Sequence, residues 1–193
     1  MNINKMKLYT GALAILLLLP NLSLAYFTTS QSATRLTENT VLYTVTYRFG
    51  FAERELYMPI MAVRGIQAPT SSPFMGYQIM NNDDTVSTIG VSNSIVLSKD
   101  KDVQIKSGQY YLPPQKSAEF TLVTLLTIPP EQKTEDLDLS LLVTNLPFTM
   151  VDNGTPIPAH LNPSELQYYH TPSINFGDSG IKISGAVHTL STK

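Results

Sequence analysis

The chain has 193 residues, of which 42% are hydrophobic, with a formal net charge of −2 and no cysteine. Without cysteine it can form no disulfide and carry no cysteine-linked lipid, so an exported form depends on its core alone for stability. No basic cluster stands out, which argues against nucleic acid and anionic membranes as partners.

The first 25 residues have the three-part layout of a secretory signal peptide. Lys5 and Lys7 give a short positive region, Leu8–Leu19 is almost wholly apolar, and Ser23 and Ala25 place small residues before a cleavage site. The apolar run is shorter than the ~20 residues that span a bilayer, which disfavours an uncleaved anchor. We therefore predict an exported chain, periplasmic or extracellular, with residues 1–25 removed.

Cleavage after Ala25 would leave Tyr26–Lys193 as a single domain. Two lysines leave with the signal, so the net charge changes from −2 to −4. The first stretch, Tyr26–Asn39, is rich in Ser, Thr and Gln, and is either a mobile tail or a weak first strand that docks onto a neighbour.

Thr40–Phe49 has the clearest strand pattern in the chain. Val41, Tyr43, Val45, Tyr47 and Phe49 alternate with mainly Thr residues, with Leu42 as the exception, as expected for a half-buried strand. The next alternating run, Glu55–Val63, contains Pro59, and proline within a strand predicts a sheet edge or a bulge.

The segment Phe120–Ile128 is apolar on both faces, because Val123 and Leu125 fall between the alternating Phe120, Leu122, Leu126 and Ile128. This pattern predicts a strand that is covered on both sides near the centre of a sheet. Leu137–Val143 alternates in turn and is expected to be its antiparallel neighbour.

The rest of the chain offers short strands between turn signals. Asp152-Asn153-Gly154 indicates a tight turn, Pro156–Pro163 an irregular proline-rich segment, and Ser173–Phe176 with Ile181–Val187 a last pair of strands. The tally of eight to ten short strands without a long amphipathic helix predicts an all-β antiparallel β-sandwich, immunoglobulin-like; a small β-barrel is the alternative.

Gly177-Asp178-Ser179-Gly180 resembles the sequence around the nucleophile of chymotrypsin-like serine proteases. That family has a catalytic histidine far upstream, whereas the first histidine here is His160. A serine without a base is not activated, so a hairpin turn is the better interpretation.

His160, Glu165 and His170 form the one close grouping of typical metal-ligand residues, but their spacing fits no helical zinc site. Asp83-Asp84 and the Asp100/Asp102 pair lack the regular oxygen-ligand spacing of a calcium loop. We therefore assign no catalytic, cofactor or metal residue and expect no cofactor.

Two pairs of adjacent tyrosines, Tyr110-Tyr111 and Tyr168-Tyr169, would stack on sugars or proline-rich peptides if both rings were exposed. In an alternating strand, one ring of each pair points into the core instead.

The sequence favours a non-enzymatic exported module that binds a protein partner or self-associates, through an exposed strand edge. The alternative is a small secreted hydrolase or metal-binding protein that uses residues 156–178, and it requires His160, Glu165, His170 and Asp178 to converge.

Overall fold

The computed structural model describes residues 24–51, 53–65, 73–81, 85–132, 137–161 and 169–176, and for 24–29 the backbone alone. Strands of two sheets make up most of these residues, and one short 3₁₀ helix spans Pro130–Gln132. Within these ranges no helix is long and apolar enough to cross a membrane.

The first sheet has four antiparallel strands in the order β1-β2-β10-β7. These are β1 (Leu24–Thr37), β2 (Thr40–Phe51), β10 (Lys116–Thr127) and β7 (Val91–Ser98). The segment Tyr26–Asn39 is thus a strand over nearly all of its length, and β1 begins two residues inside the predicted signal peptide.

The second sheet has the order β4-β5-β11-β3-β9-β8. Its longest strand, β11 (Asp138–Asp152), lies at its centre. Its other strands are β4 (Ala62–Arg64), β5 (Met75–Asn81), β3 (Glu55–Pro59), β9 (Gln109–Leu112) and β8 (Gln104–Lys106). Three further strands flank it: β12 (Thr155–Leu161) and β13 (Ile174–Asn175) pair with β11, and β6 (Val86–Ser87) pairs with β5.

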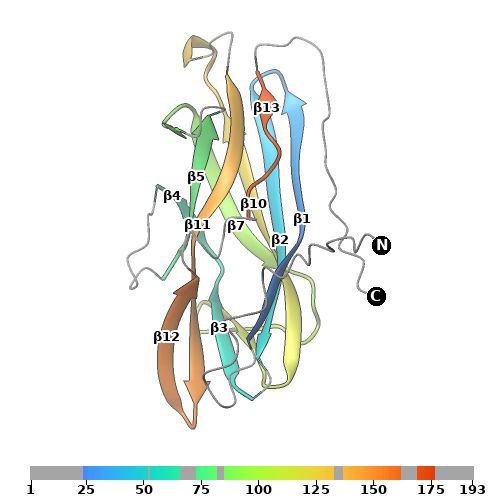
Figure 1. The fold of residues 1–193 in the computed structure, drawn as a ribbon, viewed down its shortest axis with the longest axis vertical. Coiled ribbons are helices and arrows are strands. Elements are labelled where there is room, and N and C mark those ends of the chain that lie inside the picture. The colour runs from blue at the N-terminus through green and yellow to red at the C-terminus, as the bar shows by residue number, and fades with distance from the viewer. Residues whose placement is uncertain are drawn as a thin grey trace, which may run out of the picture.

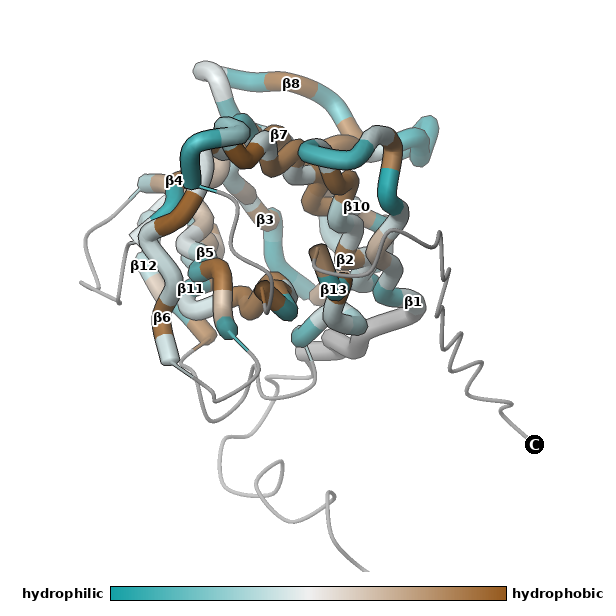
Figure 2. The backbone as a smooth tube through the Cα atoms, turned by 90° about the horizontal axis from the view of Figure 1, so that it is seen from above, coloured by the Kyte–Doolittle hydropathy of each residue, from teal (hydrophilic) through white to brown (hydrophobic). Residues whose placement is uncertain are grey.

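The two sheets pack face to face around one hydrophobic core, so the predicted all-β sandwich is confirmed (Figure 1). Seen from above, β7 and β4 lie next to each other at one side of the sandwich, and β13 lies between β11 and β1 at the other (Figure 2). The single domain over residues 26–193 stays a prediction.

Three strand predictions were wrong. The neighbours of β10 are β2 and β7, and β11 lies in the opposite sheet. The predicted run Glu55–Val63 is divided after Pro59: β3 is no edge, because it pairs with both β11 and β9, and Pro59 is tolerated as its last residue. Only the end of the run, in β4, lies at the end of the strand order. The proline-rich 156–163 is not irregular throughout, since β12 pairs with β11 over Thr155–Leu161.

The expectation that β10 is covered on both faces was also wrong. Phe120, Leu122 and Leu126 are buried, but Val123 and Leu125 on the other face are half-exposed. The outer face of this sheet therefore retains apolar side chains that no described element covers completely.

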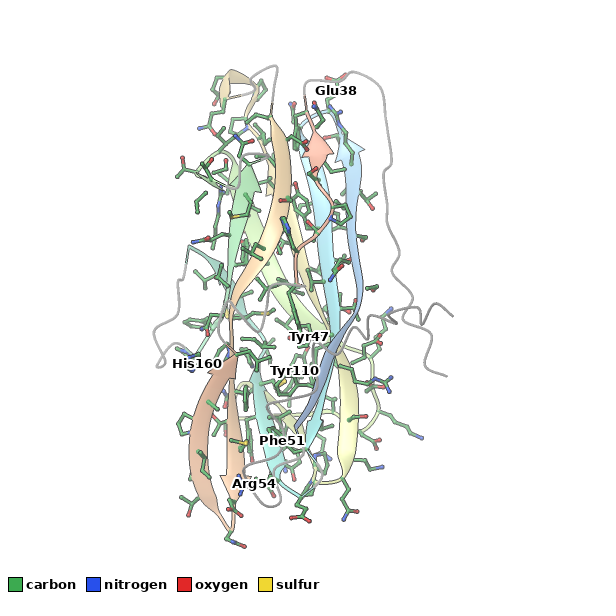
Figure 3. All side chains as sticks on the ribbon, viewed as in Figure 1. Glu38, Tyr47, Phe51, Arg54, Tyr110 and His160 are labelled. Atoms are coloured by element: carbon green, nitrogen blue, oxygen red, sulfur yellow. The ribbon has the colours of Figure 1, made fainter. Side chains whose placement is uncertain are left out.

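Buried tyrosines connect the two sheets. The Tyr43 hydroxyl donates to the Leu139 carbonyl at 2.8 Å, from the first sheet to β11. The Tyr47 ring lies 5.9 Å from both Phe120 and Tyr169, at mid-height of the sandwich (Figure 3). Ring contacts of this kind stabilise the fold beyond what the buried area of the rings contributes.

Burial, with Asp138 nearby, raises the pKa of Tyr43 far above its ordinary value of 10.0. The unfolded chain can lose this proton above pH 10 and the folded chain cannot, so the contribution to stability is complete below that pH and is lost as the pH rises. We predict that the free energy of unfolding falls above pH 10 and that Tyr43→Phe reduces the slope by up to about 1.4 kcal/mol per pH unit.

Denaturant titrations between pH 8 and pH 11 test this prediction. At pH 8 the variant should be about 1–2 kcal/mol less stable, because the Leu139 carbonyl loses its buried donor. If the free energy of unfolding of Tyr43→Phe falls above pH 10 as steeply as that of the wild type, the fold does not keep this hydroxyl protonated.

Candidate functional site: the strand edges

The outer edge of β1 is the longest edge of the first sheet. On β2, the Phe51 carbonyl accepts from the Gln115 N–H (3.1 Å), and just before it the Asn39 carbonyl accepts from the Ile128 N–H (2.8 Å). Because backbone groups alternate sides along a strand, odd-numbered β2 residues point to β10 and even-numbered ones to β1.

The register then shows which β1 backbone groups point outward. Ser30, Ser32 and Thr34 lie opposite the even-numbered Thr46, Thr44 and Leu42, so their N–H and C=O groups belong to the ladder with β2. Tyr26, Thr28 and Ala33 lie opposite odd-numbered residues and direct their backbone groups away from the sheet. An extended peptide that paired with β1 would meet these outward-directed groups.

The opposite edge of the same sheet, β7, is covered. Met61 forms a bridge with Ile95, and the Val96 N–H donates to the Ile60 carbonyl at 2.9 Å. Ile60 and Met61 continue directly into β4, the strand at one end of the strand order of the second sheet. The two sheets close onto each other on this side.

The edge strand β12 is blunted by proline. A two-residue turn, Asn153-Gly154 with φ of 48° and 80°, joins it to β11. In such a hairpin Asp152 and Thr155 form the closing hydrogen-bonded pair, so the N–H positions of 156 and 158 point outward. Both are proline, and the outer edge therefore lacks two of its donors.

The remaining edges are short: β6 and β13 have two residues each, and β8 has three. Short strands, prolines and covering segments are the devices by which β proteins protect their edges. Among the described strands, β1 is the long edge without proline: it spans 14 residues and has one charged residue, Arg35. Its register shifts between Thr28 and Ser30 and between Arg35 and Thr37, and the segment 169–176 lies beside it at its Arg35 end.

The segment 169–176 closes the sandwich between β11 and the first sheet. The Thr171 N–H donates to the Leu141 carbonyl (2.8 Å) and the Val143 N–H to the Tyr169 carbonyl (3.0 Å). Tyr169, Ile174 and Phe176 are buried in the core. The Arg35 guanidinium lies 5.6 Å from the centre of the Phe176 ring, which links the segment to β1.

The two histidines of the candidate metal site lie far apart. His160 lies opposite Pro147 on β11 and His170 opposite Leu142, which are five residues apart along the strand, or about 16 Å. One ion cannot bind both imidazoles at ~2 Å. Glu165 and the Gly177–Gly180 turn, with Asp178, lie outside the described residues, as do Asp83 and Asp84.

The Asp100/Asp102 turn has a structural role. The Asp100 carboxylate accepts from the Glu119 N–H, and Asp102 forms an ion pair with Lys116 at 3.3 Å. Across the described ranges, no three His, Cys, Asp or Glu residues gather in a way that would hold a metal.

One polar pair was missed by the sequence analysis: Ser140 Oγ lies 2.6 Å from His170 Nε2. A serine nucleophile needs a base that a third group orients, together with access for the substrate. Ser140 is only 4% exposed, so the pair is best explained as an anchor for the closing segment. No sequence spacing signals it, because the two residues are 30 apart.

Both tyrosines of the first pair are buried, so this pair does not divide between core and surface as predicted. Tyr110 points inward, where its hydroxyl donates to the Val96 carbonyl at 3.0 Å, and Tyr169 is buried. The Tyr111 ring packs against Tyr57 and is covered by the Lys106 ammonium, 3.2 Å from the ring centre. Tyr111 therefore offers no open platform to a sugar, and Tyr168 lies outside the described residues.

Comparisons with known proteins give likenesses to solved structures alone. No family model matches the chain, and no curated protein does. A solved structure of the CssB subunit, complemented with a donor strand from the CssA subunit of the enterotoxigenic Escherichia coli colonization factor CS6, is similar to it. The TM-score is 0.42 at 10% identity, covering 79% of this chain and 95% of that one.

The closing segment should contribute substantially to stability. Truncation of the buried Phe176 to alanine removes a core ring and leaves a cavity, which should cost about 3–5 kcal/mol. The exposed Ser173 in the same segment is the matched control, and Ser173→Ala should stay within ~0.5 kcal/mol of the wild type. Denaturant unfolding measures both, and equal values would contradict this role for the segment.

Proposed function

We propose that the chain is an exported, non-enzymatic module that assembles with another protein chain by strand addition along β1. The observation that carries the proposal is the contrast between β1 and the other described edges, which are short, covered or interrupted by proline. Proteins protect edges that should not pair, so the long edge without proline is the one expected to accept a partner.

The chemistry of strand addition suits this edge. The partner supplies an extended segment whose main-chain groups bond to the outward-directed groups of β1, and side-chain contacts on both faces add specificity. The mature chain would retain Tyr26–Thr37 of the strand after cleavage at the predicted site. The partner is thus another envelope or surface protein, or another copy of this chain.

The described residues give no observation that supports the hydrolase or metal-binding alternative. His160 and His170 are too far apart for one site, and Ser140 is buried beneath its histidine. We therefore propose binding or assembly, rather than catalysis, as the role of the exported chain.

A pair of proline variants tests the proposal. Thr28→Pro removes an outward-pointing N–H and no ladder bond, so it should leave the fold stable and prevent pairing with a partner. The matched Ser30→Pro removes a ladder N–H and should destabilise the fold itself by about 3 kcal/mol or more.

Native electrophoresis of envelope fractions from cells that export the chain gives the readout. The wild type should migrate in a larger complex and Thr28→Pro as free, folded chain. A complex that persists in a folded Thr28→Pro variant would rule out assembly along this edge, as would a wild type found only as free chain.

A further inference from the structure

The outer face of the β1-β2-β10-β7 sheet carries an apolar surface. One cross-strand row runs over Met61, Ile95, Val123, Thr44 and Ser32, each residue paired with the next. Met61 is 56% exposed and Ile95 44% exposed. We call this surface, with the rows on either side of it, the outer face.

The neighbouring rows have the same character. Leu125 lies opposite Leu42 in one of them, and in the other the exposed Leu97 lies opposite Thr121. Apolar side chains therefore gather over β7 and β10, and Ser and Thr side chains over β1 and β2.

No charge interrupts the outer face. The stretches 30–34, 40–46, 91–97 and 121–127, which contribute the four strands, contain no Asp, Glu, Lys or Arg. Charges appear beyond its ends: Arg48 and Glu119 lie opposite each other and are exposed at one end, and the exposed Glu38 lies in the turn between β1 and β2 at the other. An uncharged centre with a charged rim is the usual layout of a protein interface.

Four hydroxyls of the outer face are paired with each other within it. Ser32 and Thr44 hydroxyls lie 2.7 Å apart, and those of Thr46 and Thr121 lie 3.0 Å apart. A hydroxyl that is hydrogen-bonded to its neighbour can be buried at little cost, because no polar group is left unsatisfied. The polar part of this face thus tolerates the loss of water.

We infer that the outer face packs against the same face of a second copy of this chain. The chain has a net negative charge, so two copies repel each other, and they approach with least repulsion through a surface without charge. A two-fold axis in the interface and across the strands brings the apolar strands β7 and β10 onto their own copies, as in aligned sheet packing.

The area is sufficient for such a dimer. Strands are spaced by about 4.8 Å and same-face residues along a strand by about 6.7 Å, so three rows over five segments have a flat area of roughly 500 Å². This is of the order of the ~800 Å² of accessible surface that each partner buries in a standard interface.

Sedimentation velocity of the exported chain, from about 1 to 300 µM, tests the dimer. The wild type should shift from monomer to dimer with concentration. Ile95→Lys and Met61→Lys, from two different segments of one row, should each weaken association at least tenfold by burying an unpaired charge. Ile105→Lys is the matched control, since Ile105 is 67% exposed on β8, away from the outer face.

A wild type that remains monomeric at the highest concentration would overturn the inference, as would a dimer that both outer-face variants leave unchanged. Both substituted side chains are exposed, and circular dichroism melting verifies that the variants fold. The dimer is independent of strand addition along β1: Thr28→Pro should leave it intact, so failure of one proposal is distinguishable from failure of the other.

Discussion

Backbone groups at a sheet edge need a hydrogen-bond partner, and this constraint shapes the whole sandwich. An open sheet ends in strands whose outward N–H and C=O groups face water or another chain. Here Ile60–Met61 covers β7, prolines interrupt β12, and the closing segment 169–176 lies along β11. Against this background, the long and proline-free β1 stands apart.

The core keeps these edges in fixed positions. The hydrogen bond from Tyr43 to the Leu139 carbonyl joins the sheets, and the ring of Tyr47 touches both β10 and the closing segment. A cysteine-free domain has no covalent link between its sheets, so ring packing and buried hydroxyl bonds must hold them together.

Much of the fold was predictable because period-two alternation reports which side chains point inward. It identified the strand at Thr40–Phe49, the strand at Phe120–Ile128 and the turn at Asn153-Gly154. Alternation does not report which strand lies beside which, since Leu139 and Leu141 alternate equally well in either sheet. It also cannot distinguish a covered face from an exposed apolar one, as Val123 and Leu125 show.

The candidate site was less accessible to sequence reasoning. That an edge would matter was expected, but the expectation fell on Glu55–Val63, because Pro59 suggested an edge there. The prolines of β12 predict irregular structure from sequence alone, whereas they lie at the outward positions of a regular strand. Hydrogen bonds between residues far apart, such as Ser140 and His170, depend on the fold and leave no local pattern.

Amide hydrogen exchange along β1 tests the central claim most directly, in the isolated exported chain and in its assembled state. The account predicts that the outward amides of Thr28 and Ala33 exchange fast in the isolated chain and become protected on assembly, while the ladder amides of Ser32 and Thr34 are protected in both. Outward amides that are already protected in the isolated chain would contradict it, because the chain would then cover this edge itself.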